Sequence, residues 1–162
     1  MKFDYMSISL ANERETQDLG FQMAGLIEPP LCVYLEGEIG AGKTSLVRSI
    51  LRGVGFKGPV KSPTFTLVES YQFQKKNIYH FDLFRIDNPI ELEHLGVEQY
   101  LGENSILLFE WPDKGLNHIP LSDLNISITV SLTGRELLLQ SKTKTGNAIL
   151  SALGKSLGYI GD

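Results

Sequence analysis

The sequence has a single cysteine, Cys32, so no disulfide bond can form within the chain. This thiol lies in the apolar run of residues 31–35, which predicts a buried, unreactive side chain rather than a redox centre. Without disulfides the fold must depend on a hydrophobic core, and 162 residues suffice to build one. We therefore expect residues 1–162 to form a single domain.

Signals for a membrane or a nucleic acid are missing as well. No apolar run approaches the roughly 20 residues that a spanning helix needs, and the first residues do not resemble a secretory signal. The formal net charge is −4, which argues against a protein that holds DNA or RNA by electrostatics alone. These absences predict a cytoplasmic protein with no membrane or DNA partner.

A glycine-rich loop is the most informative feature that is present. An apolar run, residues 31–35, precedes it, and a helical pattern runs from Lys43 to about Leu51. The loop with its following residue consists of Gly37, Glu38, Ile39, Gly40, Ala41, Gly42, Lys43, Thr44 and Ser45. In such a turn the backbone N–H groups converge on phosphate, the lysine reaches the β and γ phosphates, and the threonine ligates Mg²⁺. The loop predicts binding of a nucleotide such as ATP with Mg²⁺.

Four basic residues lie just after this loop: Arg48, Arg52, Lys57 and Lys61. They could contact nucleotide phosphates, a nucleic acid or a protein partner. A solvated helix face followed by a basic loop explains them equally well. The sequence leaves both interpretations open.

The remaining patterns predict an α/β protein with a mixed sheet flanked by helices and containing antiparallel hairpins, as in P-loop NTPases. Asn12 with Glu15 indicates a helix start, and Pro29–Pro30 is expected to end that helix. The other expected helices begin near Pro89 and span residues 146–157. Further expected strands cover residues 3–10, 64–68, 78–81, 105–109, 124–132 and 136–141.

Two carboxylates follow apolar strands and are candidates to hold Mg²⁺ or to order a water molecule for hydrolysis. Asp82 ends the run of residues 78–81, and Glu110 ends the run of residues 106–109. Either one could be the acid that acts with the phosphate loop. His80 shares a strand face with Asp82, but a lone histidine there is more often a packing residue than a catalyst.

The segment Ser62–Pro63–Thr64 is the third element. It lies in a Gly/Pro-rich stretch after the phosphate loop, where nucleotide switches place a hydroxyl that senses the γ-phosphate and the metal. A simple turn that leads into a strand is the alternative.

Four segments in this order resemble the bacterial TsaE family, formerly called YjeE, the ATPase component of tRNA threonylcarbamoyladenosine synthesis. The segments are GEIGAGKT, VKSPTFTLVE at residues 60–69, YHFDLFR at residues 79–85 and FEWP at residues 109–112. Many ATPases share the first motif. The other three at these spacings are distinctive.

The resemblance implies a role for each matching residue. Gly40, Gly42 and Lys43 would hold the phosphates of ATP, and Thr44 with Glu110 would hold Mg²⁺. Asp82 would assist the metal or position water, and Ser62 and Thr64 would form a switch-like segment. Trp111 and Arg135 would lie close to the nucleotide, and Thr16 would border the adenine.

The resemblance also implies partners. Family members act with the TsaD and TsaB proteins, which transfer a threonylcarbamoyl group to adenosine 37 of tRNAs that read codons starting with A. ATP hydrolysis by this chain would reset that complex, so contact with tRNA would be indirect. Two alternatives remain open, a small P-loop kinase and a nucleotide-gated docking module whose hydrolysis is incidental.

Overall fold

The structure is a computed structural model that describes residues 4–158. Its strands are β1 (Tyr5–Leu10), β2 (Leu31–Glu36), β3 (Val68–Phe73), β4 (Lys76–Asp82), β5 (Ser105–Glu110), β6 (Leu124–Ser131) and β7 (Gly134–Ser141). Its helices are α1 (Glu13–Ala24), α2 (Lys43–Val54), α3 (Glu91–Leu95) and α4 (Lys144–Ser156), with 3₁₀ turns η1 (Val97–Tyr100) and η2 (Pro112–Gly115). No helix within the described range is long and apolar enough to cross a membrane.

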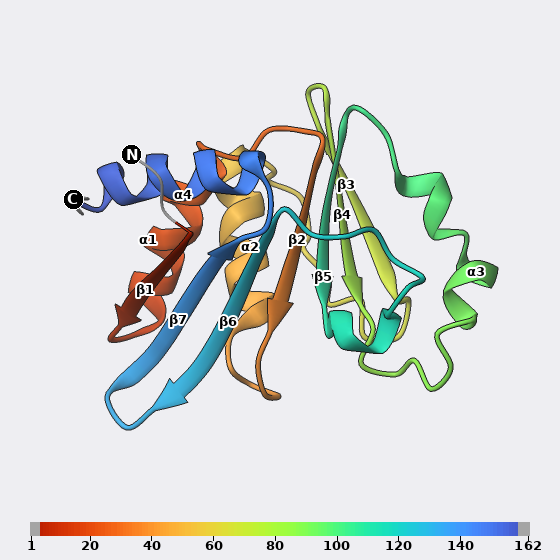
Figure 1. Cartoon of the computed structure of the whole chain (residues 1–162), viewed down its shortest axis with the longest axis horizontal. Helices are drawn as coiled ribbons and strands as arrows, with labels where there is room; N and C mark the ends of the chain where they lie inside the picture. Colours follow the sequence, from red (N-terminus) through yellow and green to blue (C-terminus); the bar gives the residue numbers. More distant parts are fainter. Residues whose placement is uncertain (1–3, 159–162) are drawn as a thin grey trace.

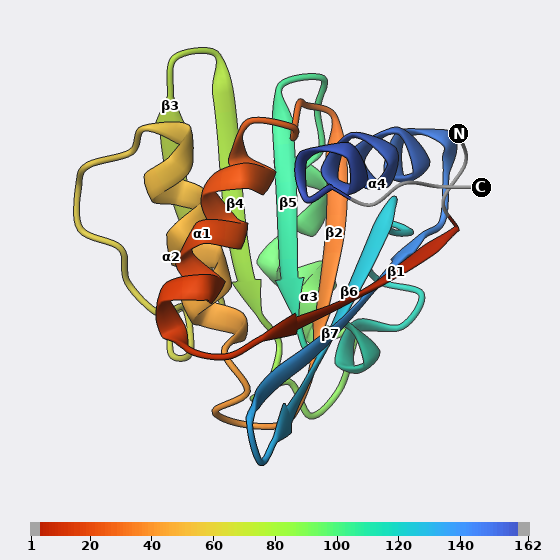
Figure 2. The same ribbon diagram turned by 90° about the vertical axis from the view of Figure 1, so that its left-hand side faces the viewer.

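All seven strands form one mixed sheet in the order β1-β7-β6-β2-β5-β4-β3. The four strands β6, β2, β5 and β4 are parallel, whereas β1, β7 and β3 pair antiparallel with their neighbours. Helices α1, α2 and α4 cover one face and α3 lies on the other (Figures 1 and 2). This arrangement confirms the mixed α/β fold that the sequence predicts.

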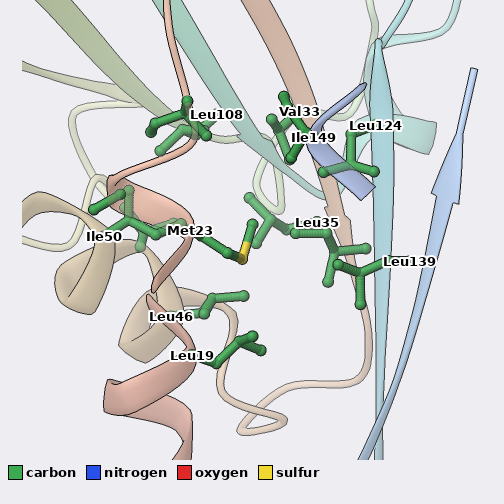
Figure 3. Packing of buried hydrophobic residues seen from close by; sticks show 14 of the residues in the cluster. Leu19, Met23, Val33, Leu35, Leu46, Ile50, Leu108, Leu124, Leu139 and Ile149 are labelled. Carbon is green, nitrogen blue, oxygen red and sulfur yellow. The ribbon is translucent and has the colours of Figure 1, made fainter. Parts of the chain in front are cut away.

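The larger hydrophobic core lies between the sheet and helices α1, α2 and α4. Side chains of the helices, such as Met23 and Leu46, meet strand residues such as Leu35 there (Figure 3). A second core forms on the α3 face around Phe81 and Phe109. All six residues of β5 are buried, as expected for a strand covered on both faces.

Helix α1 starts as predicted but ends earlier than predicted. Asn12 accepts the N–H of Glu15 at 3.0 Å, and the Glu15 carboxylate accepts the N–H of Ala11 at 2.6 Å. The helix stops at Ala24 rather than at Pro29–Pro30. It stops there because Gly25, a weak helix former, follows, and the next two N–H groups turn back to the carbonyl of Met23.

Helix α2 is longer than predicted and runs through Gly53 to Val54. Gly53 does not break the helix, because it is the point where α2 packs closely on α1. A Cβ atom at Gly53 would lie 2.6 Å from the Cβ of Ala24 and 3.0 Å from the Cα of Phe21. Gly55 caps the end of the helix, and its N–H donates to the carbonyls of Leu51 and Arg52.

The predicted strand at residues 64–68 is displaced along the chain. The hairpin of β3 and β4 exists, but its first strand begins at Val68 and pairs with Phe81. Residues 64–67 form a turn in which the N–H of Leu67 donates to Pro63 at 2.8 Å and Asp82 donates to Leu67 at 3.0 Å. The turn of the hairpin sets the register, in which Phe73 pairs with Lys76 and Val68 pairs with Phe81. In this register residues 64–67 have no partner on β4, although they are compatible with a strand.

The other predicted elements agree with the structure within a few residues. The hairpin of β6 and β7 turns at residues 132–133, and α4 covers most of the predicted helix 146–157. The short helix predicted near Pro89 is α3, which begins at Glu91 and is capped by Gly96. Phe3, included in the first predicted strand, lies outside the described residues.

The close approach of α1 and α2 predicts that Gly53→Ala destabilises the protein. The added methyl group must push α1 away, and such overpacking typically costs about 1–3 kcal/mol, more than the gain in helix propensity. Gly25→Ala is the control, because its φ is −74° and the nearest atom to an added Cβ lies 3.7 Å away. Urea denaturation should give a lower free energy of unfolding for Gly53→Ala than for Gly25→Ala; equal values would contradict this packing.

Candidate nucleotide-binding site

The glycine-rich loop joins β2 to α2 at the edge of the sheet where the parallel strands β2, β4 and β5 end (Figure 1). Helix α2 begins at Lys43, and its cap residue, Gly42, adopts φ +112° and makes no side-chain cap. No acidic residue lies in the first turn of α2. The first N–H groups of the helix therefore remain available for an anion.

Lys43 points back into the loop that precedes it. Its side chain is 5% exposed, and Nζ donates to the carbonyls of Gly37 and Glu38, the latter at 3.0 Å. Nζ also lies 4.3 Å from the ring centroid of Trp111. Burial lowers the pKa of Lys43, and the negative charges of Glu110 and Asp82 oppose this shift. The ammonium group is thus held over the mouth of the loop, between carbonyl oxygens and an aromatic face.

Other residues of the loop, and Trp111 after β5, also have defined positions around the site. Ala41 is buried and donates its N–H to the carbonyl of Glu38 at 3.1 Å, whereas Ile39 is exposed at the tip of the loop. Trp111 packs against Phe84, with ring centroids 5.1 Å apart. The backbone N–H of Trp111 donates to the carbonyl of Leu35 at 3.3 Å, which places the residue beside the end of β2.

Thr44 contacts Glu110, the last residue of β5. Its hydroxyl lies 3.1 Å from Oε1 and 3.0 Å from Oε2 of the carboxylate, which is 3% exposed. The contact exists because β2 and β5 are parallel neighbours, with Leu35 opposite Glu110. A hydroxyl and a carboxylate are the oxygen ligands that Mg²⁺ prefers.

These two residues fit a Mg²⁺ site of the kind completed by substrate phosphates. Mg²⁺ in such sites uses one or two carboxylates and keeps several water ligands. Residues 4–158 contain no group of three or more His, Cys, Asp or Glu side chains that could hold a metal by themselves.

Asp82, the second candidate acid, lies opposite Glu110 at the end of β4. Its Oδ1 accepts the N–H of Phe84 at 3.0 Å, and its Oδ2 lies 3.4 Å from the hydroxyl of Thr64. Burial raises the pKa of Asp82, with a further contribution from the charge of Glu110, while the Phe84 N–H lowers it. The two acids thus have different neighbours: Glu110 contacts the phosphate loop, and Asp82 contacts the segment of residues 62–64.

Residues 62–64 lead into the turn of residues 64–67, beside Asp82. The hydroxyls of Ser62 and Thr64 lie 2.7 Å apart, and the carbonyl of Pro63 accepts the N–H of Leu67. A turn does lead into β3 here, and it brings the Thr64 hydroxyl to Asp82, so the turn and the switch-like interpretations do not exclude each other.

Arg135 reaches the phosphate loop from β7. Its Nη1 donates to Glu13 at 3.1 Å and lies 3.4 Å from the hydroxyl of Thr16, which is almost fully buried. The Glu13 carboxylate also accepts the hydroxyl of Ser45 at the start of α2. The Ser45 hydroxyl and, after it, Arg135 lower the pKa of Glu13 against the effect of burial. These contacts join α1, α2 and β7 around the loop.

The sequence does not identify Glu13 or the contact of His80 with Glu110. Glu13 has the ordinary signature of an acid in the first helical turn, and only the packing of α1 on α2 brings it to Ser45. His80 is buried, as expected for a packing residue, but its Nε2 lies 2.5 Å from Oε2 of Glu110. The alternation of His80 with Asp82 was the available signal, because it places both on the face of Glu110.

Two other sequence features have structural explanations. Cys32 is buried as predicted, and burial, with a smaller effect of Asp123, raises its pKa to about 12, which disfavours the reactive thiolate. Arg52 donates to the carbonyls of Phe56 at 3.0 Å and Gly58 at 2.7 Å. This basic residue therefore stabilises the loop after α2.

A strand, a glycine-rich loop and a helix, with an acid from the neighbouring strand facing the loop threonine, define a P-loop NTPase-like α/β protein. Within this class the chain belongs to the TsaE family: the model described as "Threonylcarbamoyl adenosine biosynthesis protein TsaE" matches residues 10–137.

Two relatives carry the name of this family, and a solved structure shows the same fold. The tRNA threonylcarbamoyladenosine biosynthesis protein TsaE of Haemophilus influenzae is 46% identical over 125 residues, covering 77% of this chain and 79% of the relative. The protein of the same name from Synechocystis is 40% identical over 118 residues, covering 70% and 74%. Bacillus subtilis YdiB has the same fold, with a TM-score of 0.81, 24% identity and coverage of 96% and 97%.

The contact between Arg135 and the loop predicts coupling between Gly42 and Arg135. A Cβ atom at Gly42 would lie 2.8 Å from Nη1 of Arg135, in addition to the strain of φ +112°. At Gly40, the control, φ is +80° but nothing lies within 4 Å. We expect Gly42→Ala to lower the free energy of unfolding, measured by urea denaturation, both in the wild type and in the Arg135→Ala background. The decrease should be smaller by at least about 0.5 kcal/mol in the Arg135→Ala background.

The cost of Gly40→Ala should not depend on residue 135, because its added Cβ has no neighbour to displace. Additivity of Gly42→Ala with Arg135→Ala would contradict the packing of the guanidinium on the loop.

Proposed function

We propose that this chain binds and hydrolyses ATP with Mg²⁺ as the ATPase component of threonylcarbamoyladenosine synthesis at adenosine 37 of tRNA. The observation that carries the proposal is the contact of Thr44 with Glu110 beside a buried Lys43. It supports a metal-dependent triphosphate site, since the loop supplies N–H donors, an ammonium group and a hydroxyl, and β5 supplies the carboxylate. The names of the relatives support the pathway.

The loop provides the phosphate contacts in this proposal. Gly40 and Gly42 allow the backbone to approach the phosphates, and Lys43 exchanges the carbonyls of Gly37 and Glu38 for phosphate oxygens. Because Lys43 is already buried and directed over the loop, little conformational entropy remains to be lost when it binds.

Thr44 and Glu110 hold Mg²⁺ in this proposal, and Asp82 either assists them as a further metal-binding acid or orients the attacking water. Bound Mg²⁺ neutralises the charge that develops on the phosphates. The raised pKa of Asp82 makes its carboxylate a stronger proton acceptor, which suits contact with water. Ser62 and Thr64 then link the state of the γ-phosphate to the loop before β3.

The flanks of the site contact the rest of the nucleotide. Trp111 packs on Lys43 on one side, and Arg135 lies across Gly42 on the other. The Thr16 hydroxyl contacts Arg135. We therefore propose that Thr16 orients the guanidinium and borders the adenine.

The pathway assignment brings partners with it. In this proposal the chain works in the cytoplasm with the TsaD and TsaB proteins, which transfer the threonylcarbamoyl group, and ATP hydrolysis resets their complex. Contact with tRNA is indirect, in agreement with the formal net charge of −4.

Lys43→Ala is expected to weaken ATP binding. Hydrogen bonds to charged groups contribute about 1.5–3 kcal/mol, so the Kd should rise about 10- to 100-fold in calorimetric titrations. Lys75→Ala is the matched control, because Lys75 is exposed in the hairpin turn between β3 and β4, at the opposite edge of the sheet. Unchanged ATP affinity in Lys43→Ala would remove the phosphate site from the proposal.

Glu110→Gln and Asp82→Asn are expected to keep the fold and to lower tRNA modification about 100-fold or more, because each removes a charge needed for metal or water. The measurement is threonylcarbamoylation of tRNA reconstituted with the partner proteins, with Glu28→Gln, which removes a surface pair to Lys76, as control. Modification at the wild-type rate by Asp82→Asn would instead favour a docking module with incidental hydrolysis.

A further inference from the structure

His80 is buried and bonded at one ring nitrogen. Its side chain is 0% exposed, its Nε2 lies 2.5 Å from Oε2 of Glu110, and within residues 4–158 its Nδ1 has no hydrogen-bond partner. A histidine that served packing alone gains nothing from an unpaired buried nitrogen, and an apolar residue would fill the position without it. Ile78, two positions earlier on the same strand face, is such a residue. The contact with Glu110 is therefore the interaction that explains an imidazole here.

The imidazole and the Thr44 hydroxyl approach the same carboxylate from different elements. Oε2 of Glu110 lies 3.0 Å from the Thr44 hydroxyl on α2 and 2.5 Å from His80 on β4. In the parallel pairing of β4 and β5, His80 stands opposite Leu108, so it reaches Glu110 diagonally along one face. Glu110 has a flexible side chain, and two donors on two separate elements fix its rotamer.

We propose that His80 is a positioning residue that donates its Nε2–H to Glu110 and holds the carboxylate toward Thr44 for metal binding. The chemistry is that of residues behind metal ligands, which orient the ligand and whose loss typically lowers metal affinity about 10- to 100-fold. His80 itself touches neither nucleotide nor metal. The inference rests on the proposed function, because it assigns Glu110 to Mg²⁺.

The test measures ATP binding by calorimetry in Mg²⁺ and in EDTA. His80→Leu removes the donor, His80→Gln retains an N–H donor of similar reach, and His118→Leu removes a histidine whose Nδ1 lies 3.3 Å from Glu93 on the α3 side. We expect His80→Leu to lower the gain in affinity from Mg²⁺ about 10-fold while the Kd in EDTA stays within about twofold of the wild type. His80→Gln should restore most of the gain, and His118→Leu should leave it unchanged.

A double variant separates positioning from general damage. Because His80 acts through Glu110, His80→Leu should add no further loss of the Mg²⁺ effect to Glu110→Gln. Any of three results would overturn the inference. His80→Leu could leave the Mg²⁺ effect unchanged, or it could weaken ATP binding equally in Mg²⁺ and in EDTA. The double variant could also show a full additional loss of the Mg²⁺ effect.

A second measurement does not depend on the folding of any variant. In ¹⁵N-histidine-labelled wild-type protein, long-range ¹H–¹⁵N spectra should show a proton on Nε2 of His80, and its absence would overturn the inference. Failure of the proposed function would give a different result. The wild-type protein would then bind no ATP, or would bind ATP equally well in Mg²⁺ and in EDTA. Either result would contradict the proposed metal site and, with it, this inference.

Discussion

The contact between the Thr44 hydroxyl and the Glu110 carboxylate is the constraint on which the site depends. It requires that the strand leading into the loop and the strand carrying the acid be parallel neighbours in the register that places Leu35 opposite Glu110. A shift of that register by one residue would turn Glu110 to the other face of the sheet, away from α2. The buried leucine and isoleucine side chains of β2 and β5 hold the register, because they fit one core on the α2 face and another on the α3 face.

The same edge of the sheet gathers buried charge that contributes little to stability. Lys43, Asp82 and Glu110 are all nearly inaccessible to solvent, and burying a charge is unfavourable unless it is well bonded. The structure offsets this cost with loop carbonyls around Lys43, a backbone N–H at Asp82, and Thr44 and His80 at Glu110. Such an arrangement is expected where the charges serve a ligand rather than the fold.

The sequence predicts what is local and misses what depends on register between distant segments. The phosphate loop is contiguous in sequence. Its glycines, lysine and threonine can therefore be predicted directly, as can the flanking strand and helix. Asp82 and Glu110 are equivalent in sequence, since each follows an apolar strand. Their different neighbours, Thr64 and Thr44, arise only when β4, β5 and α2 are packed together. The contact of Glu13 with Arg135 joins residues 122 positions apart. Residues 64–67 do not form the predicted strand, because the register of the hairpin pairs β4 with residues from Val68 onward.

Locating the metal tests the central claim most directly. Crystals grown with Mn²⁺ and a non-hydrolysable ATP analogue would mark the cation by its anomalous scattering. The account predicts a single strong peak at the phosphate loop, with the Thr44 hydroxyl and the Glu110 carboxylate as its protein ligands. A peak bound by Asp82 with Glu110 turned away from it, or no peak beside a bound nucleotide, would contradict the account.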